Sequence, residues 1–399
     1  MREKLIARVR RTESSGLRQV MSMSDSRGGI NLGPGICALP PHSRVLEAAH
    51  QALAARHHFY TPSDGVPVLK EALVTRYVKR NGMPVTQENV LVTCGATGAL
   101  ECICKAFLEA GDEVVVFEPF YEYHVRQVMD RGATVRYLRL RPPDWTFSEE
   151  ELKSAITEKT KLFVFSNPNN PTGRVFSRAE LEMLGSVCRD AGVIVVSDEV
   201  YEYILNEPCE HVSLASLPGM FEHSLTISSA GKTFLVTGWR IGWLVGPEEI
   251  MHSLKHKSDE TFLCAPAPLQ YAVAECMSFE DDFFQQIPLQ FQRKCRQLCD
   301  ALRDFGFTPQ SPEGAYYVLA GYERLGYRSD IEAMNALMET IGVAAIPGSA
   351  FFQQRKSTGL LRFCFAVDDD LIDKACQRLR GGKQLACAVP RVEQAKLVT

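Results

Sequence analysis

Lys232 is the residue whose position first suggests covalent chemistry. It follows the small residues of Ser228–Gly231, just beyond a strand candidate. A lysine placed there can be partly desolvated, which lowers the pKa of an amine and favours its nucleophilic, neutral form. Eight residues later stands Arg240, whose guanidinium could hold a phosphate through paired, charge-assisted hydrogen bonds. Each signal is weak alone, because most lysines and arginines are solvated.

An acidic residue stands at the end of another strand candidate. Asp198 comes directly after an apolar run, and Tyr201 follows three residues later. A carboxylate there is costly to bury without a partner. A protonated pyridine nitrogen is one such partner, and the ion pair would keep the ring cationic so that it accepts electrons. The alternative is that Asp198 caps a helix.

Two turns also follow strand candidates. Asn167–Gly173 reads NPNNPTG, and its two prolines and glycine predict a rigid turn that could aim an amide side chain at a ligand. The alternative is a tight connection. Gly95–Ala99 places small residues between a strand and a helix, so that backbone N–H groups can approach an anion at the helix N-terminus.

Two aromatic residues and a basic residue complete the candidates. Phe120 and Tyr121 follow a strand end, and either ring could lie against a flat cofactor, although packing in an aromatic core is the commoner fate. Arg362 interrupts the apolar run Leu361–Phe365. A buried arginine needs an anionic partner, and an α-carboxylate fits its forked geometry.

The elements that must position these residues alternate along the chain. Short runs that are apolar on both faces alternate with helix-like segments, which is typical of buried parallel strands covered by helices. The fold class is therefore predicted to be α/β, with ligands gathering beyond the carboxyl ends of the strands. The strand candidates are Val90–Thr93, Glu113–Phe117, Lys161–Phe165, Val193–Val196 and Leu225–Ser228.

The pattern changes after about residue 275. A charged helix candidate over Asp281–Phe305 precedes strand candidates at Ala315–Leu319 and Leu361–Phe365. This predicts a large domain at 40–275 and a smaller α+β domain at 276–399, joined by the N-terminal segment 1–39.

Composition excludes several classes of function. A net charge of −4, from 44 basic and 48 acidic residues, does not favour binding to nucleic acid or anionic membrane. No apolar run is long enough to span a membrane. The 13 cysteines, an odd number without a second Cys/His cluster, indicate free thiols in a reducing cytoplasm rather than disulfides or a metal site. The basic start of the chain is interpreted as a surface helix rather than a targeting peptide.

Taken together and in this order, the motifs resemble the class I/II aminotransferases of pyridoxal-5′-phosphate (PLP) fold type I. SAGKTF and EPFYEY are most similar to the kynurenine/glutamine-transaminase branch, and the match runs from Ile30–Gly35 to Arg362. The resemblance implies a large domain with a mostly parallel sheet of seven-stranded type and a smaller α+β domain. It also implies PLP as cofactor, an L-amino acid and a 2-oxoacid as substrates, and a homodimer with shared active sites.

The resemblance further implies a role for each matching residue. Lys232 would carry PLP as a Schiff base and shuttle the proton, Asp198 would pair with the pyridine nitrogen, and Tyr201 would bond the phenolic oxygen. Tyr60 would reach the phosphate of the neighbouring subunit's cofactor. The other implied cofactor contacts are Gly95, Ala96, Thr97, Tyr121, Asn170, Ser229 and Arg240, and the implied substrate contacts are Gly35, Asn170 and Arg362.

Two departures from the family pattern bear on the substrate. Ile36 and Cys37 follow Gly35 where the branch often has Phe-Pro, in a loop that borders the substrate in relatives. Thr97 stands where a prokaryotic aspartate-specific subgroup has a lysine, so neutral or aromatic donors are favoured. Two alternatives remain: a PLP-dependent lyase or cyclase on the same scaffold, and a non-enzymatic regulator that senses PLP.

Overall fold

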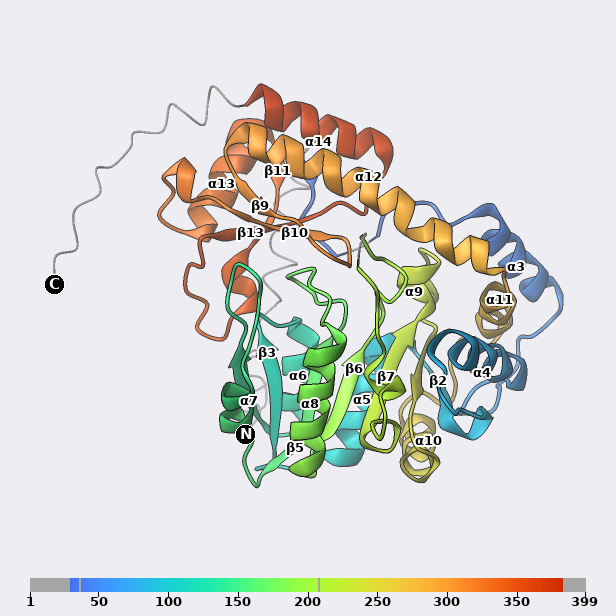
Figure 1. Ribbon diagram of the computed structural model, residues 1–399. Coiled ribbons are helices and arrows are strands. Elements are labelled where there is room, and N and C mark those ends of the chain that lie inside the picture. Colours follow the sequence, from blue (N-terminus) through green and yellow to red (C-terminus); the bar gives the residue numbers. More distant parts are fainter. Residues whose placement is uncertain (1–28, 36, 207–208, 383–399) are drawn as a thin grey trace, which may run out of the picture. The chain divides into compact units, whose positions relative to one another are not determined.

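The computed structural model describes residues 29–35, 37–206 and 209–382 (Figure 1). These residues form two compact units, each with its own core. The large unit holds the described residues of 37–293 and 312–316, and the small unit holds 29–35, 294–311 and 317–382. The basic start of the chain, Ile36 and the tail beyond Gly382, on which the sequence also carries predictions, lie outside the described residues.

The chain leaves the large unit inside α12 (Asp281–Phe305), after Arg293, rather than at the predicted boundary near residue 275. Contacts of the first turn of α12 explain the difference. Arg76 donates to Asp281 over 2.9 Å, and its guanidinium carbon lies 3.9 Å from the ring centroid of Phe284. The first half of this helix therefore packs as part of the large unit.

A seven-stranded sheet forms the centre of the large unit in the described chain, in the order β2-β8-β7-β6-β5-β3-β4. Strand β8 is antiparallel to both neighbours, and the other pairs are parallel. The predicted α/β class and the predicted strands are confirmed. The strands are β2 (Val90–Thr93), β3 (Glu113–Glu118), β4 (Thr134–Arg139), β5 (Thr160–Ser166), β6 (Ile194–Asp198), β7 (Ser224–Ser229) and β8 (Gly242–Val245).

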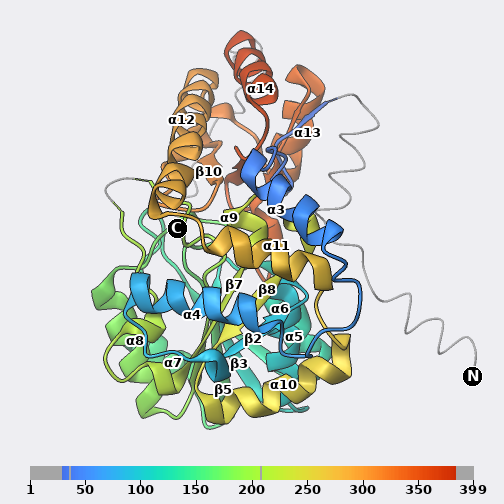
Figure 2. The same cartoon turned by 90° about the vertical axis from the view of Figure 1, so that its right-hand side faces the viewer.

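Helices cover both faces of this sheet. Figure 2 shows α7 and α8 on one side and α5, α6 and α10 on the other, while α3, α4 and α11 pack together beyond β2. The helices of the large unit are α3 (Ser43–Ala54), α4 (Pro67–Asn81), α5 (Gly95–Phe107), α6 (Glu122–Asp130), α7 (Glu149–Ala155), α8 (Arg178–Asp190), α9 (Ala230–Thr233), α10 (Glu248–Phe262) and α11 (Ala267–Met277).

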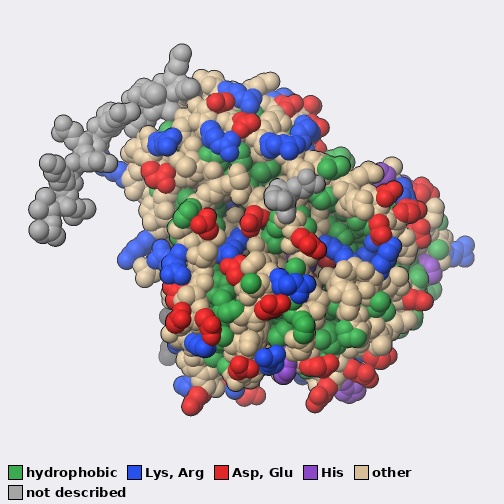
Figure 3. All heavy atoms as spheres, viewed as in Figure 1, with side chains coloured by type: hydrophobic (Ala, Val, Ile, Leu, Met, Phe, Trp, Pro, Cys, Tyr) green, Lys and Arg blue, Asp and Glu red, His purple; other side chains and the backbone are tan. Residues whose placement is uncertain are grey.

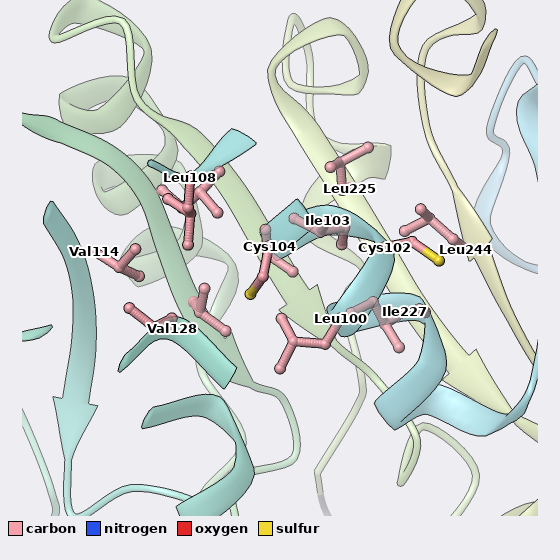
Figure 4. Packing of buried hydrophobic residues seen from close by; sticks show 14 of the residues in the cluster. Leu100, Cys102, Ile103, Cys104, Leu108, Val114, Val128, Leu225, Ile227 and Leu244 are labelled. Carbon is pink, nitrogen blue, oxygen red and sulfur yellow. The ribbon is translucent and has the colours of Figure 1, made fainter. Parts of the chain in front are cut away.

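Helix α5 is anchored by the main apolar core. Its buried residues Leu100, Ile103 and Cys104 belong to one cluster with Val114 of β3 and Ile227 of β7 (Figure 4). Removing these side chains from water stabilises the fold and leaves little freedom for the helix to shift. The core therefore fixes the N-terminus of α5 at the carboxyl ends of the strands.

The small unit contains a four-stranded antiparallel sheet in the order β12-β13-β10-β9 and a parallel pair, β1 and β11. The strand predicted at Ala315 begins at Tyr317 instead, because Ala315 has a left-handed backbone (φ 57°). Besides the second half of α12, this unit contains β1 (Ile30–Asn31), β9 (Thr308–Gln310), β10 (Tyr317–Gly321), α13 (Asp330–Ile341), β11 (Val343–Ala344), β12 (Ile346–Pro347), β13 (Leu360–Cys364) and α14 (Asp369–Gly381).

The distribution of charged side chains on the surface agrees with the near-neutral net charge of the chain. Acidic and basic side chains are interspersed over the face seen in Figure 3. Among the described helices, none is long and apolar enough to cross a membrane. The twelve cysteines that the structure describes are all free thiols, and no cluster of metal-ligand type occurs within the same residues.

Candidate active site

Lys232 lies on the short helix α9, directly after β7, and its amine is held by a tyrosine. Nζ donates to the hydroxyl of Tyr316 over 2.6 Å. Tyr316 is fully buried, and its ring stands perpendicular to that of Tyr201, with centroids 5.2 Å apart. Nζ also lies 5.8 Å from the ring centroid of Tyr201. The structure thus brings Lys232 and Tyr201 together and adds Tyr316, which the sequence did not single out.

Asp198 ends β6 and is 8% exposed. Its Oδ2 lies 3.0 Å from Nε2 of His124, and its Oδ1 accepts from the backbone N–H of Val200 over 3.3 Å. No helix begins at Asp198 in this described segment, so the capping alternative is wrong. The bond to Val200 closes a turn, and the carboxylate has a buried imidazole as partner.

His124 is a site residue that sequence reasoning missed. It is buried on α6, and its ring meets the ring of Tyr121 edge-on, with centroids 5.3 Å apart. Tyr121 precedes His124 by three residues at the start of the helix, a spacing that places two side chains on one face. That spacing is the signal that could have found His124.

The N-terminus of α5 and Arg240 form a cradle whose geometry suits an anion. One guanidinium nitrogen of Arg240 donates to Thr97 Oγ1 over 2.9 Å. A Cβ at Gly95, where φ is +75°, would come within 2.4 Å of that guanidinium, and one at Gly242 would come within 2.4 Å of the backbone of Gly95. Unpaired N–H groups and the helix dipole attract anions at such a terminus. Ala96 belongs to the same first turn.

Neighbouring strand ends place the remaining large-unit residues. Ser229 ends β7 opposite Gly242, and β6 pairs with β7 so that Asp198 lies opposite Ile227. Ser229 is therefore close to both the cradle and the acidic residue. Ser229 and Asp198 were predicted to lie at one edge of the sheet. They do so because β6 and β7 are parallel and both end there.

The NPNNPTG turn is rigid for reasons visible in its contacts. The Asn170 N–H donates to Ser166 Oγ over 3.1 Å, and Thr172 Oγ1 donates to Asn169 Oδ1 over 2.8 Å. A Cβ at Gly173 would lie 2.3 Å from Pro312. The turn is joined to the Asp198 end of β6, since the Asn167 N–H donates to the Asp198 carbonyl over 2.9 Å. Asn170 thus belongs to the same strand edge.

A buried acid–imidazole pair follows Asp198 in the chain. His211 Nε2 lies 3.5 Å from Glu199 Oε2, and both side chains are buried. Burial, and then the nearby Glu202, raise the pKa of Glu199 to about 8. Burial, and then Arg80, lower the pKa of His211 to about 3. Burial therefore disfavours the charged form of both side chains.

The small unit holds the predicted substrate-binding arginine. Arg362 on β13 is 2% exposed, and its guanidinium donates to the Gly33 carbonyl over 2.9 Å. The guanidinium carbon lies 4.2 Å from the ring centroid of Tyr317 and 4.6 Å from that of Phe351. Gly35 is in the same unit, where a Cβ would lie 2.3 Å from the Tyr317 hydroxyl. The two residues predicted to border the carboxylate thus share Tyr317 as a neighbour.

Tyr60 differs from the other predicted site residues. Its side chain is 84% exposed, and that of the preceding Phe59 is 83% exposed. Two large exposed aromatic residues in succession are unusual on a surface that faces only water.

Comparison with known proteins agrees with this geometry. The family model "aminotransferase class I and II" matches residues 27–379. The chain belongs to the aminotransferase class I and II family. The resemblance seen in the motifs, the enzyme class and amino-group transfer are thereby confirmed.

Named relatives of this aminotransferase cover nearly its whole length. Kynurenine–oxoglutarate transaminase 1 of Homo sapiens is 31% identical over 400 residues, which cover 92% of this chain and 95% of the relative. The structure of N-succinyldiaminopimelate aminotransferase from Mycobacterium tuberculosis has a TM-score of 0.89 at 32% identity, covering 94% of this chain and 98% of the other. A methionine aminotransferase structure from Escherichia coli also has a TM-score of 0.89, at 28% identity, covering 93% and 97%.

Proposed function

We propose that this aminotransferase uses PLP to move an amino group from a neutral or aromatic L-amino acid to a 2-oxoacid. One observation carries the proposal: an amine, a buried carboxylate and an anion cradle occur in the large unit at the carboxyl ends of β7, β6 and β2, three strands that run in the same direction. They are Lys232 with Tyr316, Asp198 with His124, and Arg240 at the start of α5.

The residues fit the three reactive groups of PLP. Its aldehyde needs an amine, which Lys232 supplies. Its ring nitrogen needs a carboxylate as partner, which Asp198 supplies, and its phosphate needs an anion site, which the α5 cradle supplies. Gly95 and Gly242 leave room that a Cβ would fill. When bound, PLP supplies an electron-accepting ring that acidifies the Cα–H of the substrate. Tyr121, Tyr201, Asn170 and Ser229 would hold the ring, the phenolic oxygen and the phosphate.

The residues of this chain would move and hold protons at defined atoms. The Lys232 amine, tethered beside the substrate, would act as general base at Cα, and tethering raises its effective concentration. Tyr316 would hold the Lys232 amine in position through its hydroxyl. His124, with Nε2 protonated, would donate to Asp198 Oδ2 and keep the carboxylate oriented toward the ring nitrogen.

Two features support the substrate class. Arg362 offers a planar fork suited to the α-carboxylate that amino acids and 2-oxoacids share. Thr97 lacks the positive charge that a second, distal carboxylate would need. The relatives named for kynurenine and methionine point to aromatic and neutral side chains as well.

A second copy of the chain would complete the site. The 84% exposure of Tyr60 supports its predicted role at the phosphate of a neighbouring subunit. A homodimer is therefore part of the proposal, and light scattering would test it. A cytoplasmic location is also part of the proposal, because 13 cysteines without a disulfide spacing pattern in the sequence suit a reducing compartment.

A donor panel tests the proposed function. Purified enzyme loaded with PLP is mixed with phenylalanine, methionine, glutamine or aspartate, and the visible absorption of the cofactor is followed. Neutral and aromatic donors should bleach it, and pyruvate or 2-oxoglutarate should restore it. Lys232→Ala should abolish both changes. A cysteine S-conjugate, which carries a leaving group on Cβ, tests the lyase alternative. Its conversion to pyruvate and ammonia without an added oxoacid, with no bleaching by the panel donors, would overturn the proposal.

A further inference from the structure

Asp330 is a buried carboxylate of the small unit that the proposed reaction does not use. It is 1% exposed and lies in the first turn of α13, where Ser329 is the N-cap. Burial alone would raise the pKa of Asp330, but hydrogen bonds from Tyr322, from Ser357 and from backbone amides outweigh it and lower the pKa below the ordinary 3.8. The group is therefore an ionised carboxylate held by many donors.

Apart from the Tyr322 hydroxyl, 2.6 Å from Oδ1, the donors come from both ends of the β12–β13 loop, residues 348–359. At its start the Ser349 N–H donates to Asp330 Oδ2 over 2.6 Å. At its end the N–H groups of Thr358 and Gly359 donate to Oδ1 over 2.9 and 3.2 Å, and Thr358 Oγ1 donates to Oδ2 over 3.1 Å. One side chain from α13 thus joins the two ends of the loop. Because its carboxylate is ionised, these hydrogen bonds are stronger than bonds between neutral groups.

The β12–β13 loop carries a ring that packs on the substrate-binding arginine. Phe351 is 4% exposed, and its ring centroid lies 4.6 Å from the guanidinium carbon of Arg362. Ser349 is two residues before Phe351, and Gly359 is three residues before Arg362. Asp330 therefore fixes the backbone on both sides of the ring–guanidinium contact.

We propose that Asp330 is a positioning residue for carboxylate binding: by tying the ends of the β12–β13 loop it holds Phe351 against Arg362. The inference rests on the proposed role of Arg362 as the carboxylate clamp. The amino donor and the 2-oxoacid carry the same carboxylate, so both should depend on Asp330. Proton transfer at Cα depends on Lys232, and its rate should not depend on Asp330.

Asp330→Asn tests the inference directly. The amide keeps one acceptor oxygen but turns a donor toward the loop N–H groups, which loses charge-assisted bonds. We expect KM for both substrates to rise about tenfold, with kcat changed less than about twofold. The dissociation constant of 3-phenylpropanoate, which has a carboxylate and no amino group, should rise equally in calorimetry. The cofactor absorption should stay unchanged.

Ser329→Ala is the matched control on the same helix end. It removes the cap bond from the Glu332 N–H, 3.2 Å long, but none of the bonds to Asp330. It should lower the melting temperature without changing ligand affinity. If Ser329→Ala and Asp330→Asn lower the melting temperature equally and also weaken ligand binding equally, the loss of affinity reflects general destabilisation of the small unit. That result would overturn the inference. Should Asp330→Asn not fold, Ser357→Ala removes one 2.7 Å bond to Asp330 and should raise the dissociation constant about threefold.

A double-mutant cycle tests whether Asp330 acts through Phe351. Phe351→Leu should itself weaken 3-phenylpropanoate binding, and Asp330→Asn should add little in that background. Additive effects would refute the inference. Arg362→Lys separates the two proposals: if it weakens binding while Asp330→Asn does not, only the Asp330 inference fails. If Arg362→Lys has no effect, the clamp is wrong and the Asp330 inference falls with it.

Discussion

Removing the Tyr316 hydroxyl should slow amino-group transfer without unfolding the enzyme. Tyr316→Phe keeps the fully buried ring and its packing against Tyr201 and Phe291, whose ring centroids lie 5.2 and 5.9 Å away. It removes the 2.6 Å bond to Lys232 Nζ. The Lys232 amine gains positive charge as it takes up the Cα proton, and a hydrogen bond to a charged group contributes about 1.5–3 kcal/mol. Since about 1.4 kcal/mol corresponds to a factor of ten, we expect kcat/KM to fall about 10- to 100-fold.

The assay is a single-turnover half-reaction in a rapid-mixing instrument. The amino donor is used with hydrogen or deuterium at Cα. If the hydroxyl positions the Lys232 amine for proton abstraction, the isotope effect should increase in the Tyr316→Phe enzyme. Tyr77→Phe is the matched control, because Tyr77 is a buried tyrosine of the same unit that accepts from Trp243 instead. Parent-like rates, or an equal slowing in both variants, would refute the reasoning.

Two further changes are predicted. His124→Phe keeps a ring against Tyr121 but removes the donor 3.0 Å from Asp198, so kcat/KM should fall about tenfold and the cofactor absorption should titrate at a shifted pH; an unchanged titration and rate would count against a role for His124. Glu199 is neutral in the fold because burial raises its pKa to about 8, whereas the ordinary value is 4.5. The stability it contributes is complete below pH 4.5 and is lost as the pH rises through 8. Glu199→Gln, which cannot ionise, should therefore lose less melting temperature than the parent between pH 4.5 and 8, and parallel melting curves would contradict this.

Local sequence patterns predicted the strands that place the site. Apolar runs such as the one before Asp198 form buried strands because both of their faces must be covered. The edge strand β4 is half exposed and has no such run, so no local signal marked it. The antiparallel strand β8 was missed as well, since its four residues follow closely on the Arg240 loop.

The sequence by itself determined the family, the α/β class and the motifs around Lys232, Asp198 and Arg240, because their chemistry lies in contiguous residues. Only the tertiary structure decided their partners. Tyr316 is 84 residues from Lys232, and His124 is 74 residues from Asp198. Such pairs depend on strand order, register and the direction in which each helix leaves the sheet. These are properties of the packed core, which joins distant segments through contacts that no local pattern encodes.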